Sequence, residues 1–223
     1  MEKVLYIIPT PIGNLEDITL RAIRLLKESD IVLAEDTRVT RKLFNHYNIT
    51  TKMMSYHVFN EHQKTQKIIA TINEGLKVSL VSDAGTPSIS DPGFLLIREC
   101  IKNSINVICL PGPTACISAL VQSGLPSEKF NFEGFIPAKK GRKKALADIA
   151  NRKSTTIIYE SPHRILKTLH ALKKIINNRD IVVLKELTKI HESVFRGDIS
   201  DVTNAVSKSK IKGEFVIILD GRK

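Results

Sequence analysis

The sequence has 223 residues, of which 42% are hydrophobic and 26% charged, the balance of an ordinary globular protein. No apolar run reaches the roughly 18 residues that a membrane-spanning helix needs, and the first strand-like segment follows Met1 without a signal-peptide pattern. We therefore expect a cytoplasmic protein in which Cys100, Cys109 and Cys116 are buried thiols, because they show no Cys-x-x-Cys spacing.

The net charge of +11 is distributed unevenly along the chain. Residues 1–120 hold 13 basic and 12 acidic side chains, whereas residues 121–223 hold 21 and 11. A basic half of this kind favours a polyanionic partner, most often nucleic acid, although lysine-rich surfaces also serve solubility alone.

Short apolar segments alternate with amphipathic segments along the first half of the chain. Strands are predicted at 4–8, 31–34, 78–81 and 106–110. Helices are predicted at 17–28, 39–47, 64–74 and 92–103, and a further helix after residue 115 ends at Gly124. This alternation predicts a mostly parallel sheet.

Each of these strands runs into a loop of polar and turn-forming residues. The loops are PTPIGN at 9–14, EDTR at 35–38, SDAGTPSISDPG at 82–93 and PGPTA at 111–115. Because the carboxyl ends of parallel strands meet at one edge of a sheet, we expect the loops to converge on a ligand. Loop 82–93 is the most informative, since its small residues can bring backbone N–H groups and hydroxyls close to that ligand.

A second α/β segment follows a predicted linker at 123–128. Its strands are predicted at 130–135, 155–159, 181–184 and 214–219, and its helices at 142–151, 165–176 and 203–208. The sequence thus predicts an α/β protein of two α/β domains, 1–123 and 124–223, with the basic excess in the second.

Several classes of site are disfavoured. The first strand is followed by no G-x-G-x-x-G, and the chain has no G-x-x-x-x-G-K-[ST], so neither a dinucleotide site nor a P-loop is expected. No metal site is expected, because His57 and His62 are five residues apart and no carboxylate group completes a ligand set.

Two polar groups are candidates for acid–base chemistry. Glu35 and Asp36 stand beside Arg38 just after a strand, where they could take the proton of a substrate hydroxyl or simply form a helix N-terminus. His57 is a second candidate base, on a predicted loop with Asn60 and Glu61 that could also be merely solvated.

The run KKGRKK at 139–144 is predicted to be an exposed loop that neutralises phosphates without reading sequence. Its basic residues are Lys139, Lys140, Arg142, Lys143 and Lys144.

Seven segments together resemble one known family. They are LYIIPTPIGNLEDITLRA, IVLAEDTR, SYHVFNE, VSLVSDAGTPSISDPG, PGPTA, YESPHR and KELTKIHE. They are similar to the small-subunit ribosomal RNA 2′-O-methyltransferases of the tetrapyrrole-methylase-like superfamily, which use S-adenosylmethionine (SAM). The resemblance runs in order from Val4 to about Gly221.

This resemblance implies a fold, a reaction and a set of site residues. It implies a homodimer of two-domain α/β chains, with SAM in the cleft between the domains and no metal. The implied reaction is methyl transfer to the ribose 2′-OH of a cytidine in the decoding region of 16S rRNA, within the small ribosomal subunit. The matching SAM-binding positions are Ile12, Gly13, Ser82, Asp83, Ala84, Thr114, Ala115, Glu160 and Leu187. Because a ribose hydroxyl is a poor nucleophile that needs a nearby base, we expect the catalytic residues to be Glu35, Asp36, Arg38 and His57.

The sequence departs from the family in two respects. Ser82-Asp83-Ala84 stands where relatives carry Gly-Asp-Pro, and the sequence ends at Lys223, where members compared with it continue into an extension. We therefore expect RNA contacts made by such an extension to be missing or replaced. Two alternatives stay open: a tetrapyrrole (precorrin or uroporphyrin) C-methyltransferase of the same fold, and a non-catalytic RNA-binding protein.

Overall fold

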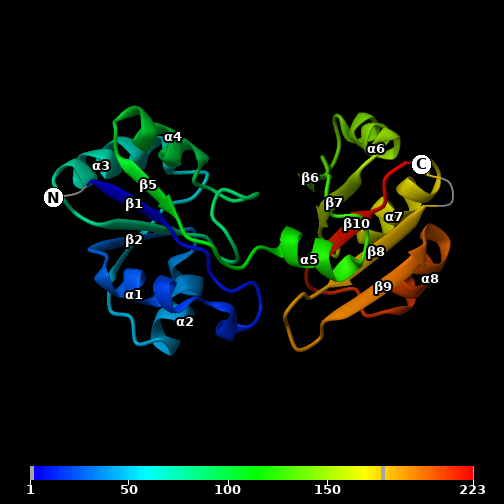
Figure 1. Cartoon of the computed structure of the whole chain (residues 1–223), viewed down its shortest axis with the longest axis horizontal. Coiled ribbons are helices and arrows are strands. Elements are labelled where there is room, and N and C mark those ends of the chain that lie inside the picture. The colour runs from blue at the N-terminus through cyan, green and yellow to red at the C-terminus, as the bar shows by residue number, and fades with distance from the viewer. Residues whose placement is uncertain (1–2, 177–178, 223) are drawn as a thin grey trace. The chain divides into compact units, whose positions relative to one another are not determined.

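The computed structural model describes residues 3–176 and 179–222, which form two compact units. The first unit ends at Thr114 and the second begins at Ala115 (Figure 1). The sequence placed the division after Ser123, whereas in the structure helix α5 (Ala115–Ser123) belongs to the second unit.

The first unit is built on a five-stranded parallel sheet with the strand order β3-β2-β4-β1-β5. Its strands are β1 (Val4–Ile7), β2 (Ile31–Ala34), β3 (Lys52–Ser55), β4 (Val78–Val81) and β5 (Asn106–Cys109). The predicted parallel sheet is confirmed. Strand β3 was not predicted, because the sequence KMMS at the sheet edge has neither alternation nor β-branched residues.

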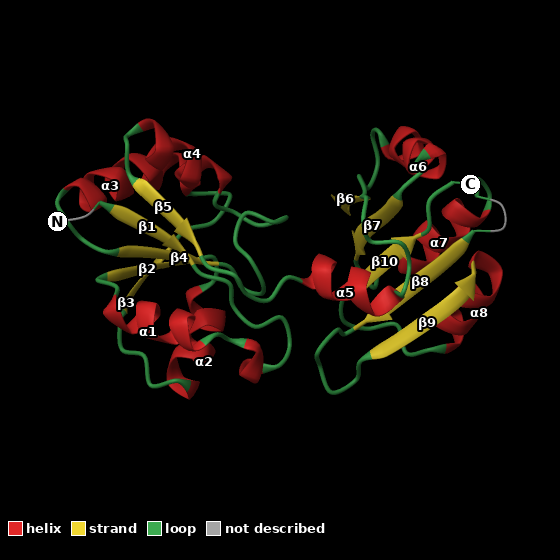
Figure 2. Ribbon diagram, in the orientation of Figure 1, coloured by secondary structure: helices red, strands yellow, loops and turns green. Residues whose placement is uncertain are grey.

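Helices cover both faces of this sheet (Figure 2). They are α1 (Leu20–Glu28), α2 (Thr37–His46), α3 (Glu61–Asn73) and α4 (Phe94–Lys102), and a 3₁₀ turn, η1 (Leu15–Asp17), precedes α1. Side chains of α3 and α4 pack with Leu5 and Leu80 on one face, and those of α1 and α2 pack with Val32 and Val81 on the other. Since both faces are buried, β4 is apolar or buried at every position, as parallel strands in such layers are.

The second unit has a mixed five-stranded sheet with the strand order β6-β7-β10-β8-β9. Its strands are β6 (Phe130–Phe135), β7 (Thr155–Glu160), β8 (Asp180–Lys185), β9 (Ser193–Asp198) and β10 (Phe215–Leu219). Only β6 and β7 are parallel, and β10 lies antiparallel between β7 and β8. Helices α6 (Arg142–Asn151), α7 (Ile165–Lys173) and α8 (Ile199–Lys208) pack against it in one apolar cluster, and α5 contacts β7 and β10.

Two local predictions were wrong, and a second strand besides β3 was missed. Cys109 is exposed, because β5 is the edge strand and leaves this side chain uncovered, whereas Cys100 and Cys116 are buried as expected. Strand β9 was not predicted, since its sequence SVFRGD is mostly polar and pairs only with β8. Helix α3 begins at Glu61, so this residue does not lie on a loop.

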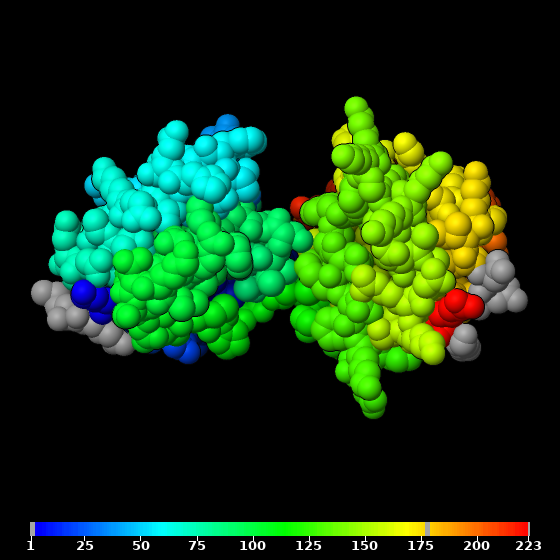
Figure 3. Space-filling model, turned by 90° about the horizontal axis from the view of Figure 1, so that it is seen from above, coloured from blue at the N-terminus to red at the C-terminus, as the bar shows by residue number. Residues whose placement is uncertain are grey.

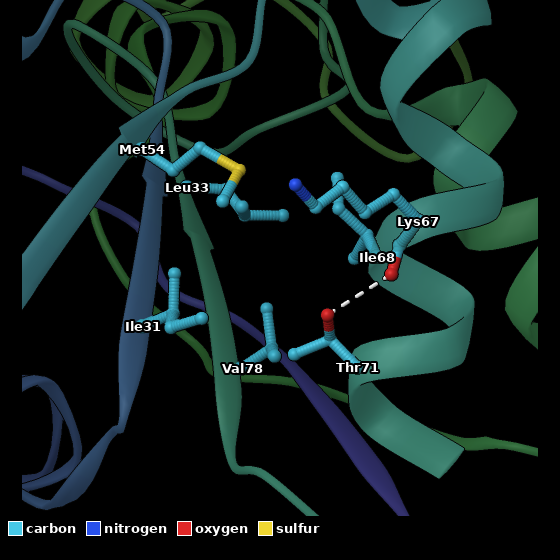
Figure 4. Close-up of a pocket in the computed structure, with 7 residues that line it drawn as sticks. All are labelled: Ile31, Leu33, Met54, Lys67, Ile68, Thr71 and Val78. Carbon is cyan, nitrogen blue, oxygen red and sulfur yellow. Dashed lines mark hydrogen bonds between the residues drawn. The ribbon is translucent and has the colours of Figure 1, made fainter. Parts of the chain in front are cut away.

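A small hollow in the first unit lies beneath α3 (Figure 4). It is lined by Ile31, Leu33, Met54, Lys67, Ile68, Thr71 and Val78. Its walls are mostly apolar, and Ile31 and Val78 stand at the amino ends of their strands. Leu33 and Met54 stand nearer the carboxyl ends of their strands, so the hollow runs along the sheet beneath α3. None of the described helices is both long and apolar enough to cross a membrane.

Candidate functional site

The loops after β1 and β4 are joined directly to each other. Thr10 and Gly85 exchange two backbone hydrogen bonds of 2.9 Å, and the Thr10 hydroxyl donates to the carbonyl of Ser82 at 3.1 Å. Gly85 has a φ of +81°, a conformation that glycine adopts without the strain of a side chain. The expected convergence of loops 9–14 and 82–93 is thus confirmed.

The loop after β5 joins the same group. The Thr86 hydroxyl donates to the Pro113 carbonyl at 3.0 Å and lies 2.6 Å from the Thr114 hydroxyl. Gly112 packs so closely on Pro9 that a Cβ at this position would lie 2.6 Å from the proline ring. Three loops far apart in the sequence therefore form one surface at the carboxyl edge of the sheet.

The EDTR loop is attached to this surface through its carboxylates. The Asp83 carboxylate accepts the backbone N–H of Asp36 at 2.9 Å, and the Glu35 carboxylate accepts the backbone N–H of Asp83 at 3.3 Å. The two loops therefore hold each other by reciprocal bonds. This arrangement brings three carboxyl groups to the end of β2 and β4.

The three carboxyl groups differ in acidity. Burial raises the pKa of Glu35, although the hydrogen bond from the backbone N–H of Asp83 opposes part of this rise. Burial likewise raises the pKa of Asp83. By contrast, hydrogen bonds from Arg38 lower the pKa of Asp36 to about 2. Glu35 is therefore a better proton acceptor near neutral pH than Asp36.

Asp36 and Arg38 form an ion pair with each other. The Arg38 guanidinium contacts both carboxylate oxygens of Asp36, the shortest distance being 2.6 Å between Nη2 and Oδ2. Asp36 also caps α2 by accepting the backbone N–H of Arg38 at 2.8 Å. Asp36 thus fills the helix N-terminal role that the sequence left open. The Arg38 side chain is 88% exposed and can still meet an anion from solvent.

His57 lies beside the EDTR loop because of the unpredicted strand β3. This strand pairs with β2, and the N–H of Tyr56 donates to the carbonyl of Ala34 at 2.8 Å. The chain after β3 therefore emerges next to Glu35, and His57 interacts electrostatically with the Glu35 carboxylate. The structure brings together Glu35, Asp36, Arg38 and His57, all within the first unit.

The first-unit positions that the resemblance assigned to SAM lie on this same edge. Ile12 and Ser82 are buried, Thr114 is half-buried, and the others are exposed. The exposed ones are Gly13, Asp83 and Ala84. This edge carries three carboxyl groups, of which Asp36 is paired with Arg38, so its charge suits a cationic ligand such as the sulfonium of SAM.

The remaining SAM positions belong to the second unit. Ala115 begins α5, and Leu187 is buried in the loop after β8. Glu160 is only 1% exposed at the end of β7, and its carboxylate is already engaged by Arg164 at 3.0 Å and by the Thr168 hydroxyl at 2.5 Å. The side chain of Glu160 therefore holds β7 to α7, and any contact it makes with a ligand goes through the backbone.

The expected basic surface needs one correction. Arg142 is only 9% exposed, and its guanidinium donates to the Thr168 hydroxyl at 2.8 Å and to the Pro137 carbonyl at 3.4 Å. It is therefore a packing residue and not a free surface cation. The other four basic residues of this run are exposed, namely Lys139, Lys140, Lys143 and Lys144. Figure 3 shows the yellow-green segment around α6 on the surface of the second unit.

The structure also shows features that the sequence interpretation missed. Phe59 is 91% exposed in the turn that carries His57, at a centroid distance of 6.0 Å between the two rings. Ser88 and Ser90 adopt φ values of +72° and +66°, so loop 82–93 carries backbone strain. The described residues form no group of three or more side chains that could hold a metal ion.

Comparisons with known proteins agree with this fold. A family profile described as Tetrapyrrole (Corrin/Porphyrin) Methylases matches residues 4–203. A solved structure of a cobalt precorrin-4 methyltransferase superposes with a TM-score of 0.69 at 18% identity, covering 98% of this chain and 95% of that one. At this identity the likeness concerns the fold alone.

Two curated relatives are far more similar in sequence. A protein of Halalkalibacterium halodurans is 48% identical over 97% of this chain and 75% of its own length. A protein of Thermotoga maritima is 43% identical over 98% of this chain and 99% of its own length. Both are named ribosomal RNA small subunit methyltransferase I, and they differ in how far they continue beyond the matched region. The chain belongs to the tetrapyrrole methylase family, and within it to the group that these two relatives represent.

Proposed function

We propose that the protein transfers a methyl group from SAM to the ribose 2′-OH of a cytidine in the decoding region of 16S rRNA. The observation that carries this proposal is the pair of reciprocally bonded loops that places Glu35 beside Asp83. The names of the close relatives support the RNA substrate. We also propose that the protein acts as a cytoplasmic homodimer on the small ribosomal subunit.

The residues of the first unit suit this chemistry. SAM would lie along loops 9–14, 82–93 and 111–114, with its cationic sulfonium near the carboxylates, and would supply an electrophilic methyl group. A ribose hydroxyl is a weak nucleophile, so its proton must leave as the new C–O bond forms. Glu35 would accept this proton, since the effect of burial outweighs that of the Asp83 N–H and of the His57 charge and raises the pKa of Glu35 above the ordinary value of 4.5.

Asp36 and Arg38 would position the substrate. The pKa of Asp36 is about 2, so Asp36 remains ionised and keeps the Arg38 guanidinium in place at the start of α2. The exposed side of Arg38 can then hold a phosphate of the RNA, as a guanidinium does through its planar set of donors. The task of the site is largely one of holding the hydroxyl in line with the methyl group.

A direct assay tests the proposal. The purified protein is incubated with methyl-labelled SAM and with small ribosomal subunits, or free 16S rRNA, from a strain that lacks the corresponding gene. We expect label at the 2′-O position of a single cytidine. Transfer to a tetrapyrrole and not to RNA would favour the alternative enzyme class, and SAM binding without any transfer would favour a non-catalytic RNA-binding protein.

The exposed lysines of residues 139–144 should bind the RNA backbone. Replacing them with glutamate should weaken RNA binding and make log Kd less steep in log salt, by about 0.7 for each phosphate that is no longer neutralised. SAM affinity should not change. The substituted residues are Lys139, Lys140, Lys143 and Lys144.

A matched control carries the same charge change elsewhere on the second unit. The control residues are the exposed Lys167, Lys174, Lys208 and Lys212. Glutamates at Lys143 and Lys144 lie in the first turn of α6, where they favour the helix, so weaker binding would not report unfolding. Equal salt slopes for the two variants would remove this run from the RNA-binding surface.

A further inference from the structure

A tight turn, residues 57–60, connects β3 to α3 and ties Asn60 to His57. The backbone N–H groups of Asn60 and Glu61 both donate to the His57 carbonyl at 2.9 Å. The Asn60 side chain folds back as well, and its Oδ1 accepts the backbone N–H of His57 at 2.9 Å. Asn60 therefore fixes both the backbone of this turn and the surroundings of the histidine.

The neighbours of the Asn60 amide determine which way it faces. Its Nδ2 lies 3.5 Å from the Ser55 carbonyl and 2.9 Å from Nε2 of His57. If the amide were flipped, its NH₂ group would face the backbone N–H of His57, and its oxygen would face the Ser55 carbonyl. Both contacts would then be repulsive, so the hydrogen-bond network assigns the oxygen to the backbone N–H and the NH₂ group to Nε2.

This orientation has a consequence for the imidazole. An amide NH₂ group only donates, so Nε2 of His57 must accept, and a neutral imidazole then carries its hydrogen on Nδ1. Among the described residues, Nδ1 of His57 is one of two buried side-chain polar atoms without a hydrogen-bond partner, the other being the hydroxyl of Thr40. A buried N–H donor without an acceptor costs about 1–3 kcal/mol, so this atom requires an explanation.

The nearby Glu35 carboxylate is an acceptor that explains the unpartnered Nδ1 of His57. Its carboxylate interacts electrostatically with His57, and one of its oxygens accepts the N–H of Asp83. A carboxylate oxygen has lone pairs for more than one donor. Glu35 is therefore the candidate acceptor for Nδ1–H of His57, and its other lone pairs would remain for the proton of the substrate.

We propose that Asn60 is a positioning residue that keeps the neutral His57 imidazole protonated on Nδ1, so that His57 donates to the Glu35 carboxylate and does not act as a base. The effect of Asn60 on catalysis rests on the proposed methyl transfer. Its effect on the position of the hydrogen on His57 does not. The sequence named Glu35, Asp36 and His57 as candidates and left the identity of the base open, whereas this arrangement assigns the role to Glu35.

The structural part is tested by nitrogen NMR of the full chain labelled with ¹⁵N-histidine, without SAM or RNA. His57→Gln identifies the signals of His57 among those of the six histidines. In the wild type we expect Nε2 of His57 to be unprotonated and Nδ1 to carry the hydrogen. In Asn60→Asp, whose carboxylate can only accept from Nε2, the hydrogen should move to Nε2 or both nitrogens should be protonated. A wild-type His57 protonated on Nε2 overturns the inference.

The catalytic part is tested with the same variant. Asn60→Asp retains an oxygen that accepts the backbone N–H of His57, so a purely structural Asn60 predicts a wild-type kcat. If NMR shows that Nδ1 of His57 has lost its hydrogen in this variant, the positioning role predicts a kcat lower by about 10–100-fold with little change in KM for SAM or RNA, the scale known for residues that orient metal-binding side chains. Asn45→Asp, the same change at an exposed position of α2, should match the wild type in both measurements.

The two proposals fail in different ways. An unchanged kcat in Asn60→Asp, together with a displaced hydrogen on His57, would overturn the positioning role and leave the proposed function intact. A wild-type protein with the expected NMR pattern that methylates no RNA would overturn the proposed function and leave the geometry of His57 intact.

Discussion

Replacing Glu35 with glutamine should lower kcat for RNA methylation by about 10²–10⁴-fold, the usual contribution of a general base. Glutamine has the size of glutamate and can still accept the N–H of Asp83 through its amide oxygen, so the bond between the loops survives. It cannot take a proton. SAM affinity should therefore change little, and the measurement is single-turnover methyl transfer at saturating SAM and RNA.

The pH dependence of this step separates Glu35 from other acids. Burial raises the pKa of Glu35 above its ordinary value of 4.5. Because Glu35 is a base only when it is ionised, wild-type kcat should rise as the pH increases through this raised pKa. This rise of kcat with pH should be absent in Glu35→Gln. The control Glu16→Gln removes an exposed carboxylate of the 3₁₀ turn η1 and should behave as wild type. If kcat still rises with pH in the same range in Glu35→Gln, another residue is the base.

Replacing Asp83 with alanine should abolish SAM binding in a calorimetric titration. Asp83 is an exposed residue at the sheet edge with a partly desolvated carboxylate, which offers a negative charge to a cationic ligand. It also holds the EDTR loop by accepting the N–H of Asp36 at 2.9 Å. Both losses act in the same direction, and a charged hydrogen bond alone contributes about 1.5–3 kcal/mol, roughly a 10- to 150-fold change in affinity.

A second substitution distinguishes the two roles of Asp83. The variant Asp83→Asn would keep an oxygen for the Asp36 N–H but lose the charge. If the charge matters, Asp83→Asn should bind SAM at least about tenfold more weakly than wild type. If only the bond to the EDTR loop matters, it should bind normally. Asp17→Ala is the control for the loss of an exposed carboxylate, and wild-type affinity in Asp83→Ala would refute this placement of the site.

The sequence predicted best those segments whose local residue pattern matches their burial or exposure in the folded protein. The strand at 78–81 is fully buried, and the polar residues after it could only be a loop, so both the strand and the position of loop 82–93 were predicted. The parallel sheet followed from the alternation of strands and helices. That inference also placed the loops at one edge, where Thr10 and Gly85 in fact pair.

Other parts of the site depended on long-range contacts that leave no local pattern. Strand β3 is recognisable only through its pairing with β2, and without it the proximity of His57 to Glu35 could not be predicted. Arg142 belongs to a basic run in the sequence, yet it is buried because the first turn of α6 directs its side chain toward Thr168 on α7. The orientation of the Asn60 amide depends on three neighbours and is visible only in three dimensions.

The position of β10 in the second sheet bears on how the chain folds during synthesis. This strand is the last of the described chain, yet it lies between β7 and β8, and all five of its residues are buried. Until it has been made, β7 and β8 have no partner between them, and each exposes an edge of the kind that invites intermolecular pairing. The strands of the first unit are all present once the chain has reached Cys109. Since proteins are synthesised from the amino terminus and domains generally fold as units, the first unit can form its sheet while the second waits for its final strand. The loops at the carboxyl edge of the first sheet would then be assembled before the sheet of the basic second unit is complete.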